Sequence, residues 1–275
     1  LHAEGNRELT KALLEKKVTA HAFEFFQTSQ DSFPLMRAGG CVAGMQAITY
    51  ASYFLQSSQG GMGKVLGAWP GGPGARVLII GSGTVGSTAA DLAARMGAEV
   101  VVLCSTEVSA ARYRESAREG IDIRVNSPRR LAAELPRADV VVGAILISTF
   151  DTPPMVTDAM VESMKPGSVL IDATAGYGPG YMESFTIETD LAAPSFVRHG
   201  VVHVKIGNLP AAVPVSAVSA VNALYPPFLV NFARSVFDPE FTDSVSDRGL
   251  VVSDGTIKHP ELLRHATGLG WWVAA

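Results

Sequence analysis

The stretch RVLIIGSGTVG, residues 76–86, decides the fold of this chain. Its apolar part, residues 77–80, is typical of a buried strand, and the pattern of residues 85–96 predicts an amphipathic helix directly after it. A second apolar run at 99–103 closes a strand–helix–strand unit over residues 76–104. Such a unit with a glycine-rich first turn predicts a dinucleotide site.

Three glycines in that turn match G-x-G-x-x-G. Gly81 permits the tight turn, Gly83 removes a Cβ so that a diphosphate can reach the backbone, and Gly86 lets the helix pack close to the strand. The free amides and the positive end of the helix favour an anion. The alternative is a plain glycine-rich turn without a ligand.

Short Val/Ile/Leu-rich runs separated by helical patterns continue along the chain. They predict further strands at 121–125, 140–145 and 169–172, and helices at 42–56 and 108–118. Near-continuous apolar strands of this kind are typical of a parallel sheet buried on both faces. The predicted class is α/β, a doubly wound parallel (Rossmann) sheet with a second, smaller domain.

The same patterns suggest a domain organisation. Residues 35–213 form the expected dinucleotide-binding domain, and residues 1–34 with 214–275 form the expected portion of a substrate domain. The helical pattern of 215–236 is interrupted at Pro226 and Pro227. Because the chain begins without Met, the N-terminal part of the substrate domain is expected to be missing.

Composition excludes several classes of protein. With 47% apolar and 17% charged residues the chain is an ordinary globular mixture, and its net charge of -4 gives no footprint for nucleic acid or anionic membrane. Its apolar runs are shorter than the roughly 20 residues of a membrane span. Cys41 and Cys104 lack nearby metal ligands, so we expect reduced thiols, no metal and a cytoplasmic protein.

The cofactor remains open between NADP and NAD at this point. The second strand is followed by Cys104, Ser105 and Thr106, where a carboxylate for the ribose hydroxyls is expected. Without that carboxylate a 2′-phosphate is not repelled, which gives a slight preference for NADP. The residues expected to contact the cofactor in the glycine turn and after the second strand are Gly81, Ser82, Gly83, Thr84, Val85, Gly86, Cys104, Ser105 and Thr106.

Ala144, Ile145 and Leu146 follow the strand at 140–145, at the edge where open α/β sheets bind ligands. We expect this loop against the adenosine or nicotinamide ribose; the alternative is a purely structural strand end. His199 and His203, near Lys205, lack a third metal ligand, and a satisfied or exposed histidine is favoured.

Several sequence blocks carry a family resemblance: LHA at 1–3, QGGMG at 59–63, ADVVVGA at 138–144, MKPGSVLID at 164–172 and NLPAAVP at 208–214. With these blocks and the glycine loop, the sequence resembles alanine dehydrogenase and the related domain of nicotinamide nucleotide transhydrogenase. The resemblance implies a two-domain enzyme, hydride transfer between nicotinamide and an amino-acid or imino-acid carbon, and a homo-oligomer.

The resemblance also implies roles for individual residues. His2 falls on the family's substrate-binding histidine and is the expected catalytic residue. The residues expected beside the nicotinamide are Ala173, Gly176, Asn208 and Leu209.

One departure from the family concerns the chemistry. Gly176 stands where members that oxidise alanine carry an aspartate, so Tyr177, Tyr181 or Glu183 takes its place or the substrate differs. We therefore expect an NAD(P)-dependent amino-acid dehydrogenase or imine reductase with an altered substrate. The alternative is a catalytically silent nucleotide-binding or transhydrogenase-like partner subunit.

Overall fold

A computed structural model describes residues 1, 3, 6–29, 32–145, 154–174, 180–187, 189–238, 240–268 and 270. The chain divides into two compact units, residues Gly40–Pro214 and residues Leu1–Gly39 with Val215–Ala275. Each unit is built around its own sheet.

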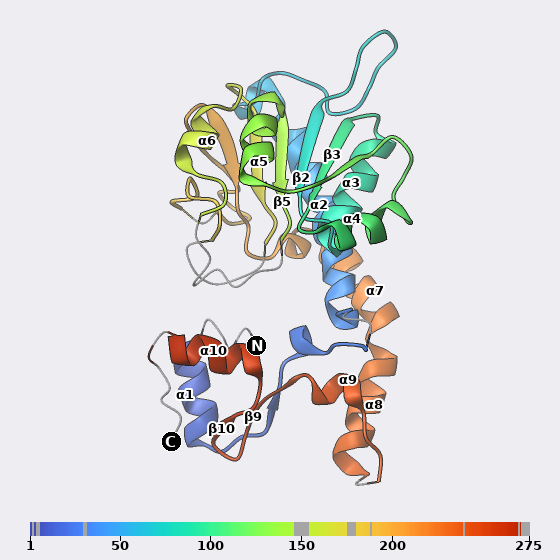
Figure 1. The fold of residues 1–275 in the computed structure, drawn as a ribbon, viewed down its shortest axis with the longest axis vertical. Helices are drawn as coiled ribbons and strands as arrows, with labels where there is room; N and C mark the ends of the chain where they lie inside the picture. Colours follow the sequence, from blue (N-terminus) through green and yellow to red (C-terminus); the bar gives the residue numbers. More distant parts are fainter. Residues whose placement is uncertain are drawn as a thin grey trace. The chain divides into compact units, whose positions relative to one another are not determined.

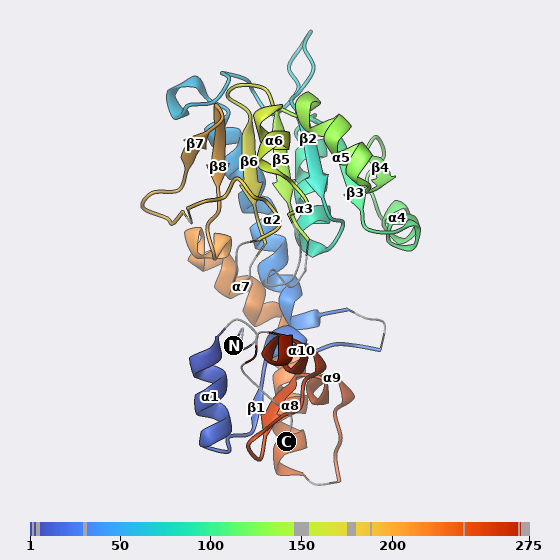
Figure 2. The same ribbon diagram turned by 60° about the vertical axis from the view of Figure 1, so that its left-hand side comes forward.

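The larger unit contains a seven-stranded sheet with the order β4-β3-β2-β5-β6-β8-β7. All neighbouring pairs are parallel except β7 with β8. Figure 2 shows the strands side by side, from β7 on the left to β4 on the right. The strands are β2 (Arg76–Ile80), β3 (Glu99–Cys104), β4 (Asp122–Val125), β5 (Val140–Gly143), β6 (Val169–Asp172), β7 (Phe196–Arg198) and β8 (Val201–Val204).

Helices cover both faces of this sheet. One face packs against α2 (Pro34–Phe54), α3 (Thr84–Arg95) and α4 (Glu107–Arg114). The other face packs against α5 (Pro128–Glu134) and α6 (Asp158–Glu162). In Figure 1, α5 lies in front of the strands and α2 behind them. Alternate residues of each strand enter the two cores, which explains the continuous apolar runs in the sequence.

The predicted α/β class with a doubly wound, mostly parallel sheet is confirmed. The antiparallel edge strand β7 was not predicted. The predicted strand 140–145 is too long, because β5 ends at Gly143. The predicted helix 108–118 is also too long, because α4 ends at Arg114 ahead of the turn that Gly120 enters at φ 87°.

The smaller unit contains a three-stranded antiparallel sheet in the order β1-β9-β10, which was not predicted. Its strands are β1 (Ala20–His21), β9 (Leu250–Ser253) and β10 (Thr256–Ile257). Its helices are α1 (Arg7–Glu15), α7 (Pro214–Leu224), α8 (Pro226–Phe237), α9 (Ser244–Asp247) and α10 (Pro260–Gly268). The expected break at Pro226 is present, since α7 ends and α8 begins there.

Within the described part of the chain, no single helix is long and apolar enough to cross a membrane. Only α7 and α8 taken together, bent by 54° at their junction, reach that length and composition.

A buried carboxylate, that of Asp139, lies at the amino edge of the larger sheet, which is the edge where the parallel strands begin. Asp139 accepts hydrogen bonds from Lys64 Nζ at 2.5 Å, Lys165 Nζ at 2.7 Å and the Arg76 amide at 2.8 Å. Burial alone would raise the pKa of Asp139, but these donors outweigh it and hold the pKa below its usual value of 3.8. The carboxylate, directly before β5, thus joins the start of β2 to the segment before β6.

Asp139→Asn removes this charge while keeping the shape of the side chain. Because the folded-state pKa is depressed, the charge stabilises the fold above the unfolded-state pKa, and this contribution is lost as the pH falls through the folded-state pKa. With both lysines partly exposed, we expect the variant to lose about 1–2 kcal/mol of unfolding free energy at pH 7 and much less near pH 3. Urea unfolding at both pH values measures this, with Glu115→Gln on the exposed end of α4 as control; a pH-independent difference would contradict it.

Candidate dinucleotide-binding site

The glycine turn joins β2 to α3 at the carboxyl edge of the sheet, the edge where the parallel strands end. Gly81 has φ 106°, a left-handed conformation that favours glycine. A Cβ at Gly81 would overlap the carbonyl oxygen of Ala144, and a Cβ at Gly86 would overlap the carbonyl oxygen of Gly81. Both glycines are therefore required by close backbone packing.

Gly83 differs from its two neighbours. It is exposed, with φ -69° and ψ -170°, and a Cβ built on it would meet no atom within 4 Å. Its conformation is open to any residue, so the fold alone does not require glycine there. As the N-cap residue of α3, Gly83 has no side chain to accept from the first amides of the helix. The turn thus presents bare amides beside open space, as an anion site needs.

The remaining residues of the loop lie around this opening. Ser82, Thr84 and Val85 are half-buried. A Cβ at Gly40 of α2 would lie 3.1 Å from Thr84, and a Cβ at Gly44 would overlap the Val85 carbonyl oxygen. Small residues on α2 therefore let α2 pack tightly against the start of α3.

The end of β3 carries the three residues expected at the adenosine ribose. Cys104 is fully buried in the core, and its carbonyl accepts from the Asn126 amide at 2.7 Å. Thr106 is the N-cap of α4: its hydroxyl accepts from the Ser109 amide at 3.1 Å, and its own amide donates to Ser109 Oγ at 3.0 Å. Ser105 is exposed, with its hydroxyl 3.4 Å from Ser109 Oγ. Of the two hydroxyl groups at the end of β3, the one of Thr106 already serves as the N-cap of α4.

The ends of β5 and β6 lie on the other side of β2. Ala144 is buried with 9% exposure, its amide donating to the Ile80 carbonyl at 2.8 Å, and Ile145 is half-buried. Ala173 is half-buried, and its amide donates to the Gly143 carbonyl at 2.9 Å. The predicted residues His2, Leu146 and Gly176 lie outside the described residues.

The block at 208–214 follows β8 at the same edge. Asn208 is exposed and precedes a 3-10 turn, Leu209–Ala212, without capping it by its side chain. Leu209 is buried with the core of the α2–α3 face. The structure thus brings every described residue of the predicted cofactor set to the carboxyl edges of β2, β3, β5, β6 and β8, while their contact with a cofactor stays a prediction.

Two other side chains considered in the sequence analysis, those of His203 and Glu183, form hydrogen bonds within the protein. His203 is buried, with Nδ1 2.9 Å from the Val201 carbonyl and Nε2 2.9 Å from Ser184 Oγ, and burial lowers its pKa to about 4. Glu183 accepts from the Asp158 amide at 2.9 Å at the start of α6. Tyr181 is fully buried, and Tyr177 lies outside the described residues. Among the described residues, no three His, Cys, Asp or Glu side chains gather as a metal site requires.

Sequence reasoning missed an ion pair at this edge. Lys205 Nζ lies 3.5 Å from Asp172 Oδ2, and both side chains are nearly buried. Asp172 ends one apolar strand and Lys205 directly follows another, and this pattern becomes a signal only once the two strands are known to be parallel neighbours.

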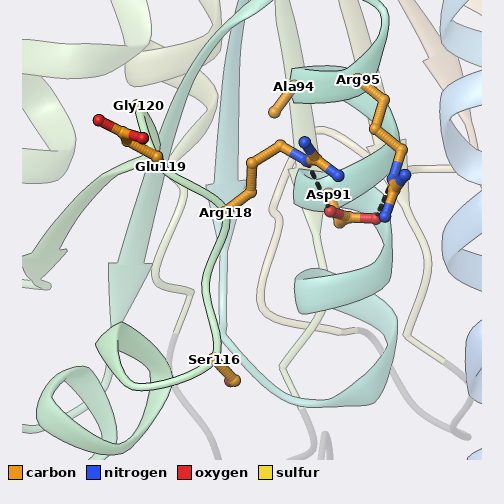
Figure 3. Close-up of a pocket in the computed structure, with 7 residues that line it drawn as sticks. All are labelled: Asp91, Ala94, Arg95, Ser116, Arg118, Glu119 and Gly120. Carbon is orange, nitrogen blue, oxygen red and sulfur yellow. Dashed lines mark hydrogen bonds and ion pairs between the residues drawn. The ribbon is translucent and has the colours of Figure 1, made fainter.

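A separate groove of about 670 Å³ lies between α3 and the loop before β4. Figure 3 shows Asp91 between Arg95 and Arg118. The N–O distances of these two ion pairs are 2.7 and 3.0 Å. These exposed charges satisfy one another, and the groove contains none of the predicted cofactor residues.

Residues 47–260 match the family model described as alanine dehydrogenase/PNT, C-terminal domain. The chain belongs to this family. The match covers most of the seven-stranded sheet's unit and continues into the smaller unit.

Individual proteins similar to this chain are alanine dehydrogenases, in agreement with the family match. The chain is 33% identical over 260 residues to an alanine dehydrogenase of Staphylococcus haemolyticus, covering 94% of this chain and 69% of that protein. It is 33% identical over 241 residues to alanine dehydrogenase 2 of Staphylococcus aureus, covering 88% of this chain and 64% of that protein. The chain therefore spans about two thirds of the length of these relatives.

Solved structures show the same fold. An L-alanine dehydrogenase superposes with a TM-score of 0.83 at 30% identity, covering 98% of this chain and 74% of that one. A transhydrogenase from Sinorhizobium meliloti superposes with a TM-score of 0.69 at 23% identity, covering 94% of this chain and 72% of that one. This second likeness concerns the fold alone.

Gly83 and Gly86 of the turn should respond differently to the same substitution. Gly86→Ala places a methyl group on the Gly81 carbonyl and 3.2 Å from Ile79 Cγ2, so we expect it to lower the unfolding free energy by about 2 kcal/mol or more. Gly83→Ala places its methyl group in open space, and we expect a change within about 0.5 kcal/mol. Thermal and urea unfolding of both variants measure this difference. Equal loss of stability in the two would show that Gly83 is also packed.

Proposed function

We propose that this chain forms the nucleotide-binding part of an NAD(P)-dependent oxidoreductase. The reaction is the reduction of an imine formed from a 2-oxo acid and an amine, or the reverse oxidation of an amino acid. The observation that carries the proposal is the turn at Gly83, where bare amides at the start of α3 face open space. Family membership supports the reaction class.

The residues at the carboxyl edge fit a nicotinamide dinucleotide. The α3 amides and helix dipole bind the diphosphate, and Gly83 leaves the space that it occupies. The end of β3 receives the adenosine ribose, and β5 lies on the opposite side of β2 from β3. The nicotinamide half therefore extends over the ends of β5 and β6, beside Ile145 and Ala173. When bound, the cofactor supplies the hydride.

The choice between NADP and NAD depends on the residues at the end of β3. The absence of a carboxylate at residues 104–106 favours a 2′-phosphate, and Ser105 is the exposed hydroxyl available to it. Against this, Thr106 serves as a helix cap, and the exposed carboxylate of Glu107 begins α4. We keep both cofactors in the proposal, and comparison of NADH and NADPH affinities decides between them.

Turnover with a panel of 2-oxo acids and amines tests the reaction class. We expect oxidation of NADH or NADPH in the presence of at least one such pair, with a substrate larger than alanine, since glycine replaces the family aspartate at Gly176. Binding of both cofactors with no turnover on any pair would instead support the silent partner subunit.

His2 is the proposed substrate-binding residue, on the family resemblance alone. We expect His2→Ala to lower kcat by about 100-fold or more, in the range that a positioned acid, base or binding histidine contributes, and to leave cofactor affinity within about twofold. Steady-state kinetics and cofactor titration measure the two effects. Equal loss of turnover and cofactor affinity would contradict a role at the substrate.

Gly83→Val tests the diphosphate contact. A valine side chain would fill the open space beside the α3 amides without meeting any protein atom near Cβ. We expect the folded variant to lose at least about 100-fold in affinity for NADH and NADPH, the cost of excluding the diphosphate from its amides. Fluorescence titration and circular dichroism provide the binding and folding measurements. Unchanged affinity in the folded variant would contradict the site.

We also propose that the protein is a homo-oligomer. Exposed apolar side chains on α7 and α8, among them Val215, Val230 and Phe237, support this proposal.

A further inference from the structure

Four side chains meet where β6 and β8 end: Asp172, Thr174, Tyr181 and Lys205. We call them the edge cluster. Lys205 Nζ lies 3.5 Å from Asp172 Oδ2, and the Thr174 amide donates to Asp172 Oδ1 at 3.0 Å. The Tyr181 hydroxyl lies 2.9 Å from Thr174 Oγ1. Tyr181 is fully buried, and Asp172 and Lys205 are exposed by only 3% and 8%.

The edge cluster also contacts the first residues after β5. The Thr174 hydroxyl donates to the Ile145 carbonyl at 3.2 Å. The Tyr181 hydroxyl reaches the backbone of β5 because Gly143 has no side chain; a Cβ there would overlap it. The next residue, Ala144, packs its carbonyl against Gly81. A continuous series of contacts therefore runs from Lys205 to the first glycine of the dinucleotide turn.

Stability alone is a poor explanation for this arrangement. A buried ion pair contributes little net stability compared with apolar residues of the same size. At the amino edge, Asp139 lies 2.5 and 2.7 Å from two lysines that remain partly exposed. Asp172 instead has a buried lysine at 3.5 Å, and burial raises its pKa against the effect of Lys205. Such pairs, at the edge where parallel sheets bind ligands, mark functional positions.

We propose that the edge cluster positions the residues directly after β5 and β6, 144–145 and 173–174, for the nicotinamide half of the dinucleotide. Lys205 acts through Asp172, and Tyr181 acts through Thr174, so both are positioning residues. The inference rests on the proposed function, because it assigns one half of the cofactor to these residues. The adenosine half and the diphosphate depend on β2, β3 and α3, which the cluster does not form.

The test compares two probes that differ only beyond the diphosphate. NADH carries the nicotinamide half, and ADP-ribose lacks the nicotinamide ring; NADPH and 2′-phospho-ADP-ribose form the matching pair. Tyr181→Phe removes one hydroxyl and keeps the buried ring. We expect it to weaken NADH or NADPH binding about tenfold and to change ADP-ribose-type binding by less than about twofold.

Lys205→Gln removes the charge but keeps a hydrogen-bond donor of similar length. We expect the same selective loss, of about tenfold or more, because Asp172 is left buried without its counter-ion. If this variant fails to fold, Tyr181→Phe still tests the cluster.

Ser184→Ala is the matched control. It removes the 2.9 Å contact to His203, which lies two residues before Lys205 and therefore on the same face of the sheet. We expect it to lower the melting temperature and to leave the ratio of the two affinities unchanged.

Two results would overturn the inference: Tyr181→Phe that weakens both probes equally, or a folded Tyr181→Phe that weakens neither. A wild-type protein that binds neither ADP-ribose nor the dinucleotide would contradict the proposed function itself. A wild type that binds both, together with a variant that loses only the nicotinamide contribution, supports both proposals.

Discussion

At the turn between β2 and α3, main-chain atoms pack directly against other main-chain atoms, with no side chain between them. Gly81 lies against the Ala144 carbonyl, and Gly86 lies against the Gly81 carbonyl, so α3 begins immediately beside the end of β2. This approach directs the first amides of α3 toward the carboxyl edge of the sheet. Gly83, between the two packed glycines, is the one of the three with open space around it. Two glycines build the turn, and the third leaves it accessible.

The two edges of the sheet use charge differently. At the amino edge, Asp139 accepts from two lysines and an amide and joins the starts of neighbouring strands. At the carboxyl edge, Asp172 and Lys205 form a looser, more deeply buried pair beside Thr174 and Ile145. The first arrangement explains stability. The second lies at the edge where a parallel sheet binds ligands, and it contacts the residues directly after β5 and β6.

Much of this could be predicted from the sequence, for local reasons. The apolar strands, the glycine turn and the break at Pro226 each depend on residues adjacent in the chain, and the structure contains all three. The small sheet of the second unit was missed because β1 and β9 are very short and pair across more than 200 residues. The link between Lys205 and Asp172 was missed for a similar reason: it depends on strand order, which no local pattern reveals.

The central claim is that a diphosphate binds the bare amides at the start of α3. Amide chemical shifts of the isotope-labelled protein, followed during titration with ADP-ribose, test it most directly. The account predicts that the largest changes fall on residues 82–86, with smaller changes at the ends of β3 and β5. Changes concentrated elsewhere, for example around Asp91 and Arg118, with residues 82–86 unaffected, would contradict it.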